Sequence, residues 1–169
     1  IITIRASKFL SDELAKKVAQ MCWGTSAPQY VNCVRKDVFD GLTDENDCFE
    51  VIAETAKGEV VGRVHCIRNE TDFSLWCYGD LFVTPEYRRM GIARQMAETA
   101  ISRLSEMGAA VLRCYVDPDN MPSRNLQKSI GFEEKPFKTF NLLDNDGEIM
   151  YEIKIPSCFC VIPATSDEA

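Results

Sequence analysis

The stretch that decides the fold of this chain is Leu81-Phe-Val-Thr-Pro-Glu-Tyr-Arg-Arg-Met-Gly-Ile-Ala-Arg94. It begins as an apolar, strand-like run, passes through a short loop and opens into a helical pattern near Gly91. The first turn of a helix leaves about four N–H groups without carbonyl partners, and the helix dipole adds positive charge there. Gly91 lets a ligand approach the backbone closely. The stretch therefore predicts an anion site suited to a diphosphate.

Three arginines, Arg88, Arg89 and Arg94, lie in this stretch, although the chain of 169 residues carries a net charge of −7. Guanidinium groups keep their charge, so the local charge is reversed. Taken alone, these residues fit a solvated surface beside a turn glycine equally well. The acidic balance argues against a general nucleic-acid binder. The sequence contains no P-loop, dinucleotide-binding or nucleophile-elbow motif.

The pattern around this stretch predicts one α+β domain over residues 1–169, with 155–169 as a C-terminal tail. With 46% hydrophobic residues the chain has enough apolar side chains for a core. Short turns between alternating runs predict an antiparallel meander, and the long helix predicts a strand–helix–strand crossover. We expect strands near 2–5, 49–54, 59–67, 73–83, 110–116, 136–140 and 149–155, helices over 11–21, 28–38, 92–107 and 122–130, and an acidic loop over 41–47.

The cysteines and the single histidine favour neither a disulfide framework nor a metal site. Eight cysteines occur without a C-x-x-C pair, and several stand inside apolar runs, where a thiol behaves as a small hydrophobe. His65 has no evident partner, so we expect it to be an ordinary sheet residue. We predict reduced thiols, no metal and a cytoplasmic protein. No apolar run is long enough to cross a membrane, and the opening residues lack the features of a signal peptide.

Two segments together resemble a known family. Val83-x-Pro85-x-Tyr87-Arg88-Arg89-x-Gly91-Ile92-Ala93 resembles the R/Q-x-x-G-x-G/A motif of the GNAT superfamily of acyl-CoA N-acyltransferases. Downstream, Asn120 to Phe132 resembles the second motif of that family, which ends in a helix followed by Gly-Phe. The order of the expected elements also matches, so the resemblance covers nearly the whole chain.

The resemblance implies a mixed, mostly antiparallel sheet of six to seven strands with helices on both faces. It also implies a splayed parallel pair, here 73–83 and 110–116, with acetyl-CoA in the opening. Backbone groups of the first strand would pair with the pantetheine arm, the loop and first helical turn would hold the diphosphate, and the second motif would bind the amide portion. The implied cofactor-binding residues are Leu81, Phe82, Val83, Arg88, Arg89, Met90, Gly91, Ile92, Ala93, Arg94, Asn120, Ser123 and Asn125.

The resemblance further implies an N-acetyltransferase that moves an acetyl group to a primary amine of a small molecule or peptide. The amine would attack the thioester directly in a ternary complex. The sequence departs from the family pattern at the acid and base positions, which fall on Gln127, Tyr115 and Cys77. Candidate catalytic residues are therefore Asp80, Tyr115 and Gln127, with Asp117 assisting a proton relay through water.

Two other functions stay open at this point. Gln127, in place of the acid of the family, favours a non-catalytic acyl-CoA sensor or regulatory module. The apolar tail around Phe159 fits a protein-interaction domain, packing on the sheet, or contact with a second copy in a homodimer. An acidic rim over 37–47 would favour a cationic amine, although runs of like charge are usually solvated loops. We expect no nucleic-acid and no membrane partner.

Overall fold

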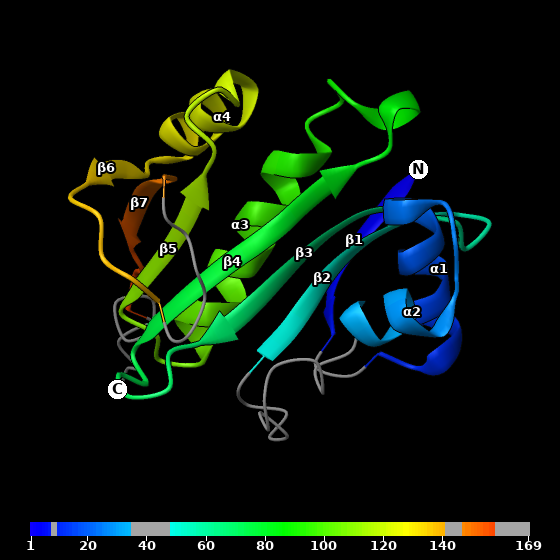
Figure 1. Ribbon diagram of the computed structural model, residues 1–169, viewed down its shortest axis with the longest axis horizontal. Coiled ribbons are helices and arrows are strands. Elements are labelled where there is room, and N and C mark those ends of the chain that lie inside the picture. The colour runs from blue at the N-terminus through cyan, green and yellow to red at the C-terminus, as the bar shows by residue number, and fades with distance from the viewer. Residues whose placement is uncertain (8–9, 35–47, 141–146, 158–169) are drawn as a thin grey trace, which may run out of the picture.

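The computed structural model of the chain describes residues 1–7, 10–34, 48–140 and 147–157. In these residues, seven strands form one sheet in the order β1-β2-β3-β4-β5-β7-β6 (Figure 1). The elements are β1 (Ile2–Ser7), α1 (Asp12–Trp23), α2 (Pro28–Val34), β2 (Cys48–Thr55), β3 (Val60–Arg68), β4 (Leu75–Val83), a 3-10 turn η2 (Pro85–Tyr87), α3 (Ile92–Glu106), β5 (Val111–Val116), α4 (Met121–Ile130), β6 (Glu133–Lys135) and β7 (Ile149–Lys154).

Helix α1 begins and ends at residues suited to those positions. The Ser11 hydroxyl accepts a hydrogen bond from the N–H of Leu14 at 3.1 Å and caps the first turn. At the other end Gly24 adopts a left-handed φ of 70°, and its N–H donates to the carbonyl of Gln20. Helices α1 and α2 pack together over one face of the sheet, where their apolar residues meet Ile52 and Val60.

Helix α3 covers the other face, behind the sheet in Figure 1. It contacts β1, β2, β3 and β4. Its buried residues recur at helical spacing, as predicted, and form a continuous apolar stripe. These residues are Ile92, Met96, Ala97, Ala100 and Leu104. The expected helices on both faces of a mixed sheet are therefore confirmed.

Strands β1 to β4 form the antiparallel meander, and β4 then pairs with β5 in parallel. Only three residue pairs join β4 to β5, from Leu75–Val111 to Cys77–Arg113. Beyond Cys77 the ladder between them ends, although β4 runs on to Val83. The expected splayed parallel pair is therefore confirmed, and the two strands diverge toward the top of Figure 1.

One expected strand is misplaced. The apolar residues of 136–140 predicted a strand there, but β6 comprises Glu133–Lys135, immediately before Pro136. Proline lacks the N–H that a ladder requires, so pairing with β7 stops at Lys135. All three residues of β6 are exposed and charged, which suits an edge strand. Residues 35–38 of the expected second helix and the acidic loop 41–47 lie outside the described residues.

Gly62 of β3 lies against Met96 of α3. A Cβ at this position would lie 3.0 Å from Met96 Cε and 3.2 Å from the backbone oxygen of Phe82. We expect Gly62→Ala to lower the free energy of unfolding by about 1–3 kcal/mol through overpacking, measured by urea denaturation. Gly79→Ala is the matched control on β4, because a Cβ there has no heavy atom within 4 Å. Equal stability of the two variants would contradict this description of the contact.

Candidate active site

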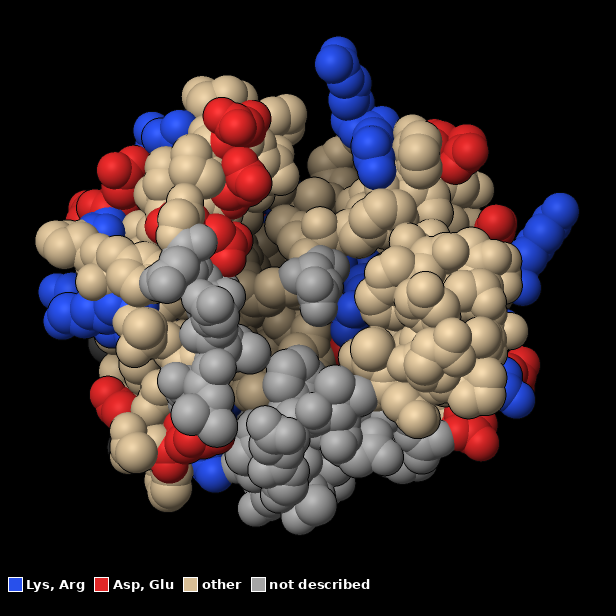
Figure 2. Space-filling model, in the orientation of Figure 1, with Lys and Arg blue, Asp and Glu red and all other residues tan. Residues whose placement is uncertain are grey.

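The opening between β4 and β5 contains a cavity of about 260 Å³. The space-filling view shows a hollow on this face, between the side formed by α4 and β5 and the side formed by α1 and α2 (Figure 2). The cavity is lined by Tyr78, Gly79, Leu81, Cys114, Tyr115, Val116, Asp117, Asn120, Ser123, Gln127 and Glu148. The described residues of its wall therefore combine both splayed strands with the first turns of α4, and they include carboxylates but no Lys or Arg.

The loop that follows β4 brings backbone donors to one end of this opening. The first intrahelical hydrogen bond of α3 runs from the N–H of Gln95 to the carbonyl of Gly91. The N–H groups of Ile92, Ala93 and Arg94 thus have no carbonyl partner within the helix. Gly91 has φ 78° and Arg89 has φ 63°, a rare left-handed conformation for a residue with a side chain. Strained backbone of this kind is found at ligand sites, and it fits a phosphate-binding turn.

The three arginines of this stretch differ in their contacts. Arg88 Nε donates to the carbonyl oxygen of Val83 at 2.8 Å, and its guanidinium lies 5.5 Å from the centre of the Phe82 ring, so it holds the loop against β4. Arg94 Nη2 donates to Ser129 Oγ at 2.6 Å and links α3 to α4. Arg89 is exposed. In Figure 2 positively charged side chains stand over the segment between β4 and α3, beside the hollow. Arg89 is therefore the one best placed for a ligand phosphate.

Helix α4 contributes the opposite wall. Asn120 is its N-cap, and Oδ1 of Asn120 accepts a hydrogen bond from the N–H of Ser123 at 3.2 Å. Both residues line the cavity. The amide nitrogen of Asn120 can still donate to a ligand carbonyl. Asn125 is exposed and does not line the cavity, so the structure separates it from the other predicted site residues.

Gln127 and Tyr78 meet in the depth of the opening. The Tyr78 hydroxyl donates to Gln127 Oε1, and the Tyr78 ring stacks on Phe132 with a centroid distance of 5.5 Å. Both polar residues are buried. Burial raises the pKa of Tyr78 well above its usual value, so the phenol stays protonated. The structure thus places a phenolic hydroxyl beside Gln127, but it comes from β4 rather than from α4.

Tyr115 and Asp80 lie on the two splayed strands. The Tyr115 hydroxyl donates to the carbonyl oxygen of Lys138 at 2.5 Å, and its ring meets Phe137 edge-on. Burial raises the pKa of Tyr115 as well. Tyr115 therefore holds the segment after β6 against the opening. Asp80 belongs to β4, but its side chain lies outside what the structure describes.

A buried charged cluster lies beside the opening, on strands β2 and β3. Glu50 Oε1 lies 2.6 Å from His65 Nδ1 and 2.5 Å from Arg63 Nη2, while Glu50 Oε2 accepts from Arg63 Nε at 3.2 Å. Burial alone would raise the pKa of Glu50, but the attraction of His65 and of Arg63, together with their hydrogen bonds, outweighs it and lowers the pKa. His65 is a sheet residue, as expected, but the expectation that it has no partner is wrong.

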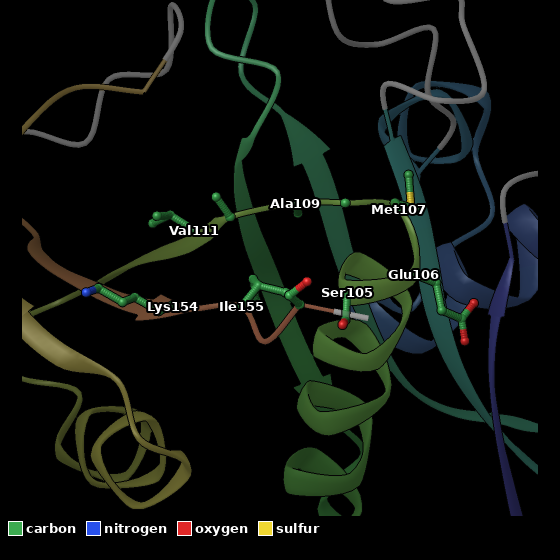
Figure 3. Close-up of a pocket in the computed structure, with 10 residues that line it drawn as sticks. Ser105, Glu106, Met107, Ala109, Val111, Lys154 and Ile155 are labelled. Carbon is green, nitrogen blue, oxygen red and sulfur yellow. The ribbon is translucent and has the colours of Figure 1, made fainter. Parts of the chain in front are cut away.

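A larger cavity, of about 640 Å³, lies at the other end of α3 (Figure 3). The end of α3, the start of β5 and the end of β7 form it, with Met107, Val111 and Ile155 among the lining residues. A helix C-terminus presents carbonyl oxygens and partial negative charge. This cavity therefore lacks the backbone donors that a diphosphate requires, despite its size.

A family model of the GNAT acetyltransferases matches residues 13–132, which is most of the chain. The chain belongs to the GNAT acetyltransferase family. Solved structures of this family share the fold. One is an acetyltransferase of the GNAT family from Staphylococcus aureus Mu50, with a TM-score of 0.69 and 14% identity over 92% of this chain and 100% of that one. A search of curated protein sequences finds no significant match.

Two further structures of N-acetyltransferases are similar at the level of the fold. The ribosomal-protein-S18-alanine N-acetyltransferase of Escherichia coli has a TM-score of 0.63 and 19% identity, covering 92% of this chain and 94% of that one. The PaiA N-acetyltransferase of Thermoplasma acidophilum, solved in complex with coenzyme A, has a TM-score of 0.64 and 16% identity, covering 90% of this chain and 99% of that one. The family resemblance inferred from the two motifs is confirmed.

Other properties of this GNAT domain bear on the remaining predictions. Within residues 1–34 and 48–157, as far as they are described, no three His, Cys, Asp or Glu side chains are arranged to hold a metal ion. No helix in the described part is long and apolar enough to cross a membrane. The six cysteines placed there form no disulfide, and burial raises the pKa of Cys66 and Cys114.

Sequence reasoning about this GNAT domain missed Tyr78, Glu50 and Arg63. The sequence did contain a signal for Glu50 and Arg63. Counting outward from the Lys57-Gly58 turn places Glu50 opposite His65 and both beside Arg63. Charged residues within strands that are otherwise apolar are rarely buried unless they are paired, so this register predicts a charged cluster.

Proposed function

We propose that this domain is an N-acyltransferase that moves an acetyl group from acetyl-CoA to a primary amine of a small molecule or peptide. The observation that carries the proposal is the opening between β4 and β5 beside the free N–H groups at the start of α3. Unpaired strand groups suit the amides of a pantetheine arm, and the helix start suits a diphosphate. The thioester supplies the activated acyl group.

The residues of the chain divide the binding task between them. Backbone groups of Leu81, Phe82 and Val83 would pair with the pantetheine arm, and Asn120 and Ser123 would bond its amides from α4. Arg89 and the backbone from Met90 to Arg94 would hold the diphosphate. Arg88 and the Arg94 side chain would act by fixing the loop and α4, since both already have partners in the protein.

Proton transfer would involve the far end of the opening. As the C–S bond breaks, the Tyr78 hydroxyl would turn its single hydrogen from Gln127 Oε1, which accepts it in the structure, to the departing sulfur. A phenol whose pKa is raised by burial stays protonated, so it remains available as a donor. Tyr115 would shape the acceptor side. Asp80 and Asp117 remain candidates for a relay through water.

A non-catalytic acyl-CoA sensor is the second candidate, because Gln127 is not itself an acid. Purified protein with acetyl-CoA and a panel of small amines, polyamines and short peptides with free N-termini separates the two. Peptides belong in the panel because a structural relative is a ribosomal-protein-S18-alanine N-acetyltransferase. Continuous release of CoA thiol, with acetylated amine seen by mass spectrometry, is expected. Thermal stabilisation by acetyl-CoA without turnover on any amine would favour the sensor.

The Tyr78 hydroxyl can be tested by a conservative change. We expect Tyr78→Phe to lower kcat by about tenfold to 100-fold, toward the lower range of general acid effects, because the departing sulfur loses its hydrogen-bond donor. Binding of acetyl-CoA, followed by its thermal shift, should persist. Gln127→Leu is the matched control, since it removes the partner and keeps the hydroxyl, and it should cost less in kcat. A Tyr78→Phe enzyme with unchanged kcat would contradict this role.

A further inference from the structure

A buried charged cluster consists of Glu50, Arg63 and His65. A contribution to the stability of the fold does not explain why this cluster is present. Each is at most 5% exposed. Replacing a buried ion cluster by well-packed apolar residues is often neutral or stabilising, and apolar neighbours surround this cluster on both strands. Clusters of buried titratable groups instead mark candidate functional sites. The position of the cluster indicates what that function is.

His65 stands opposite Gly79 across the β3–β4 ladder. The register is irregular here. The next pair along the ladder joins Arg63 to Phe82, so the segment of β4 from Gly79 to Phe82 is one residue longer than the segment of β3 opposite it. Opposite residues of an antiparallel pair point to the same face, with Cβ atoms about 4.5–5.5 Å apart. Gly79 lines the cavity between the splayed strands, and a Cβ on it would have no heavy atom within 4 Å. Gly79 therefore leaves open space at the cavity on the face of the sheet that His65 shares, while the His65 ring itself is buried behind the cavity wall.

This face of the sheet is the one that α1 and α2 cover, since Ile52, opposite Arg63, packs against them. Helix α3, whose N-terminus would hold the diphosphate, lies on the other face. An amine that enters from the α1–α2 side would therefore reach a thioester in the opening by passing Gly79, the neighbour of His65 across the ladder.

We propose that His65 is the base that accepts the proton of the attacking amine, with Glu50 and Arg63 as positioning residues. The inference rests on the proposed acyl transfer. Nδ1 of His65 pairs with the Glu50 carboxylate, which can only accept, so Nδ1 carries the hydrogen. That arrangement leaves the lone pair of the neutral ring on Nε2. Arg63 keeps Glu50 ionised and in place through two hydrogen bonds.

The step balances with the groups named. The lone pair of the neutral amine forms the C–N bond with the thioester carbon, and the C–S electron pair leaves with the sulfur. One N–H proton passes to Nε2, and the resulting imidazolium donates from Nδ1 to Glu50, whose charge stabilises it. After product release the proton returns to solvent.

Among the described residues, charged or titratable groups on the same face of the sheet as His65 include Glu50 on β2, Arg63 on β3, Cys77 on β4, and Arg113 and Tyr115 on β5. Cys22 and Tyr30 lie at the margin of the α1–α2 packing that covers this face. Arg113 is already paired with Glu152 at 2.7 Å. Within the described part of the chain, Glu50 is a carboxylate that contacts the ring.

The sequence contains one histidine, so ¹⁵N-histidine labelling of the full chain reports on His65 alone. We expect the Nδ1–H tautomer at neutral pH and an imidazole titration that coincides with a limb of the kcat/KM profile in wild type. A ring with its hydrogen on Nε2, or one whose charge stays constant where the rate changes, would overturn the proposal. This measurement needs no variant, so it decides even if substitutions unfold the protein.

Substitutions of His65 provide the second test of the proposal. We expect His65→Gln to lower kcat/KM by about 100-fold or more, to lose the titration limb and to keep the acetyl-CoA thermal shift. Imidazole in the buffer should restore part of the rate of His65→Ala. Arg5→Gln, at an exposed pair on β1, is the control expected to match wild type. A His65→Gln rate within twofold of wild type would overturn the base assignment alone, whereas no turnover by wild type would overturn the acyl transfer and this inference together.

Discussion

The double variant Arg89→Glu/Gly91→Val should lose all thermal stabilisation by CoA and acetyl-CoA. The glutamate would repel the diphosphate, and valine at a φ of 78° would distort the turn that presents the N–H groups of Ile92 and Ala93. A ligand at 100 times its Kd stabilises the wild type by about 2.7 kcal/mol. For a domain of this size that corresponds to a rise in Tm of about 5–11 °C, which differential scanning fluorimetry resolves.

The matched control is Arg103→Glu/Gly108→Val, at the other end of α3. Gly108 has a φ of 80°, and Arg103 forms only a partly exposed pair with Glu106. Both double variants carry the same change of charge and similar backbone strain, so both should lower the Tm of the free protein. Only the variant at the start of α3 should abolish the shift. A normal ligand shift in Arg89→Glu/Gly91→Val would show that the diphosphate lies elsewhere.

Glu50→Ala should be the most destabilising of the substitutions considered. It removes the carboxylate that pairs with the Arg63 guanidinium, which is buried at 1% exposure. Removing one partner of a buried ion pair costs about 3–5 kcal/mol. Urea denaturation monitored by circular dichroism measures this loss. Glu54→Ala, on the same strand, is the control, because its partner Arg5 is 46% exposed and such pairs contribute at most about 1 kcal/mol.

The same carboxylate gives a pH signature. The pKa of Glu50 is lower in the folded protein than in an unfolded chain, so the folded state binds this proton less readily. Its contribution to stability is complete above the usual glutamate pKa of about 4.3 and falls away as the pH drops through the lower value of the folded state. The difference in stability between wild type and Glu50→Ala should shrink in that acid range. A difference independent of pH would contradict the assignment.

The parts of the fold that follow local rules were predictable from sequence. Period-two runs around the Lys57-Gly58 turn gave the meander, and the capping Ser11 gave the start of α1, because both depend on neighbours along the chain. The loop before α3 was predictable for the same reason. The strand expected at 136–140 does not form, because Pro136 lacks the N–H that a ladder requires, and β6 ends just before it.

The chemistry of the site was less predictable because it depends on register between distant segments. Tyr78 and Gln127 are 49 residues apart, and their contact requires β4 and α4 to be docked. Gln127 therefore indicated a lost acid in the sequence, while the structure places a phenol beside it. His65 acquires its partners only when β2 and β3 pair, so a search for neighbouring residues in the sequence did not find them.

The short parallel ladder between β4 and β5 has a mechanical consequence. Three residue pairs join the four-stranded part of the sheet to the β5-β7-β6 part, so the backbone seam between them is weak at one end. A ligand bound between the two strands would supply hydrogen-bond partners where the ladder ends, and it would hold the two parts of the sheet together. The stability of the contact between the two parts of the sheet would then increase as the opening is occupied by ligand and decrease as the ligand leaves.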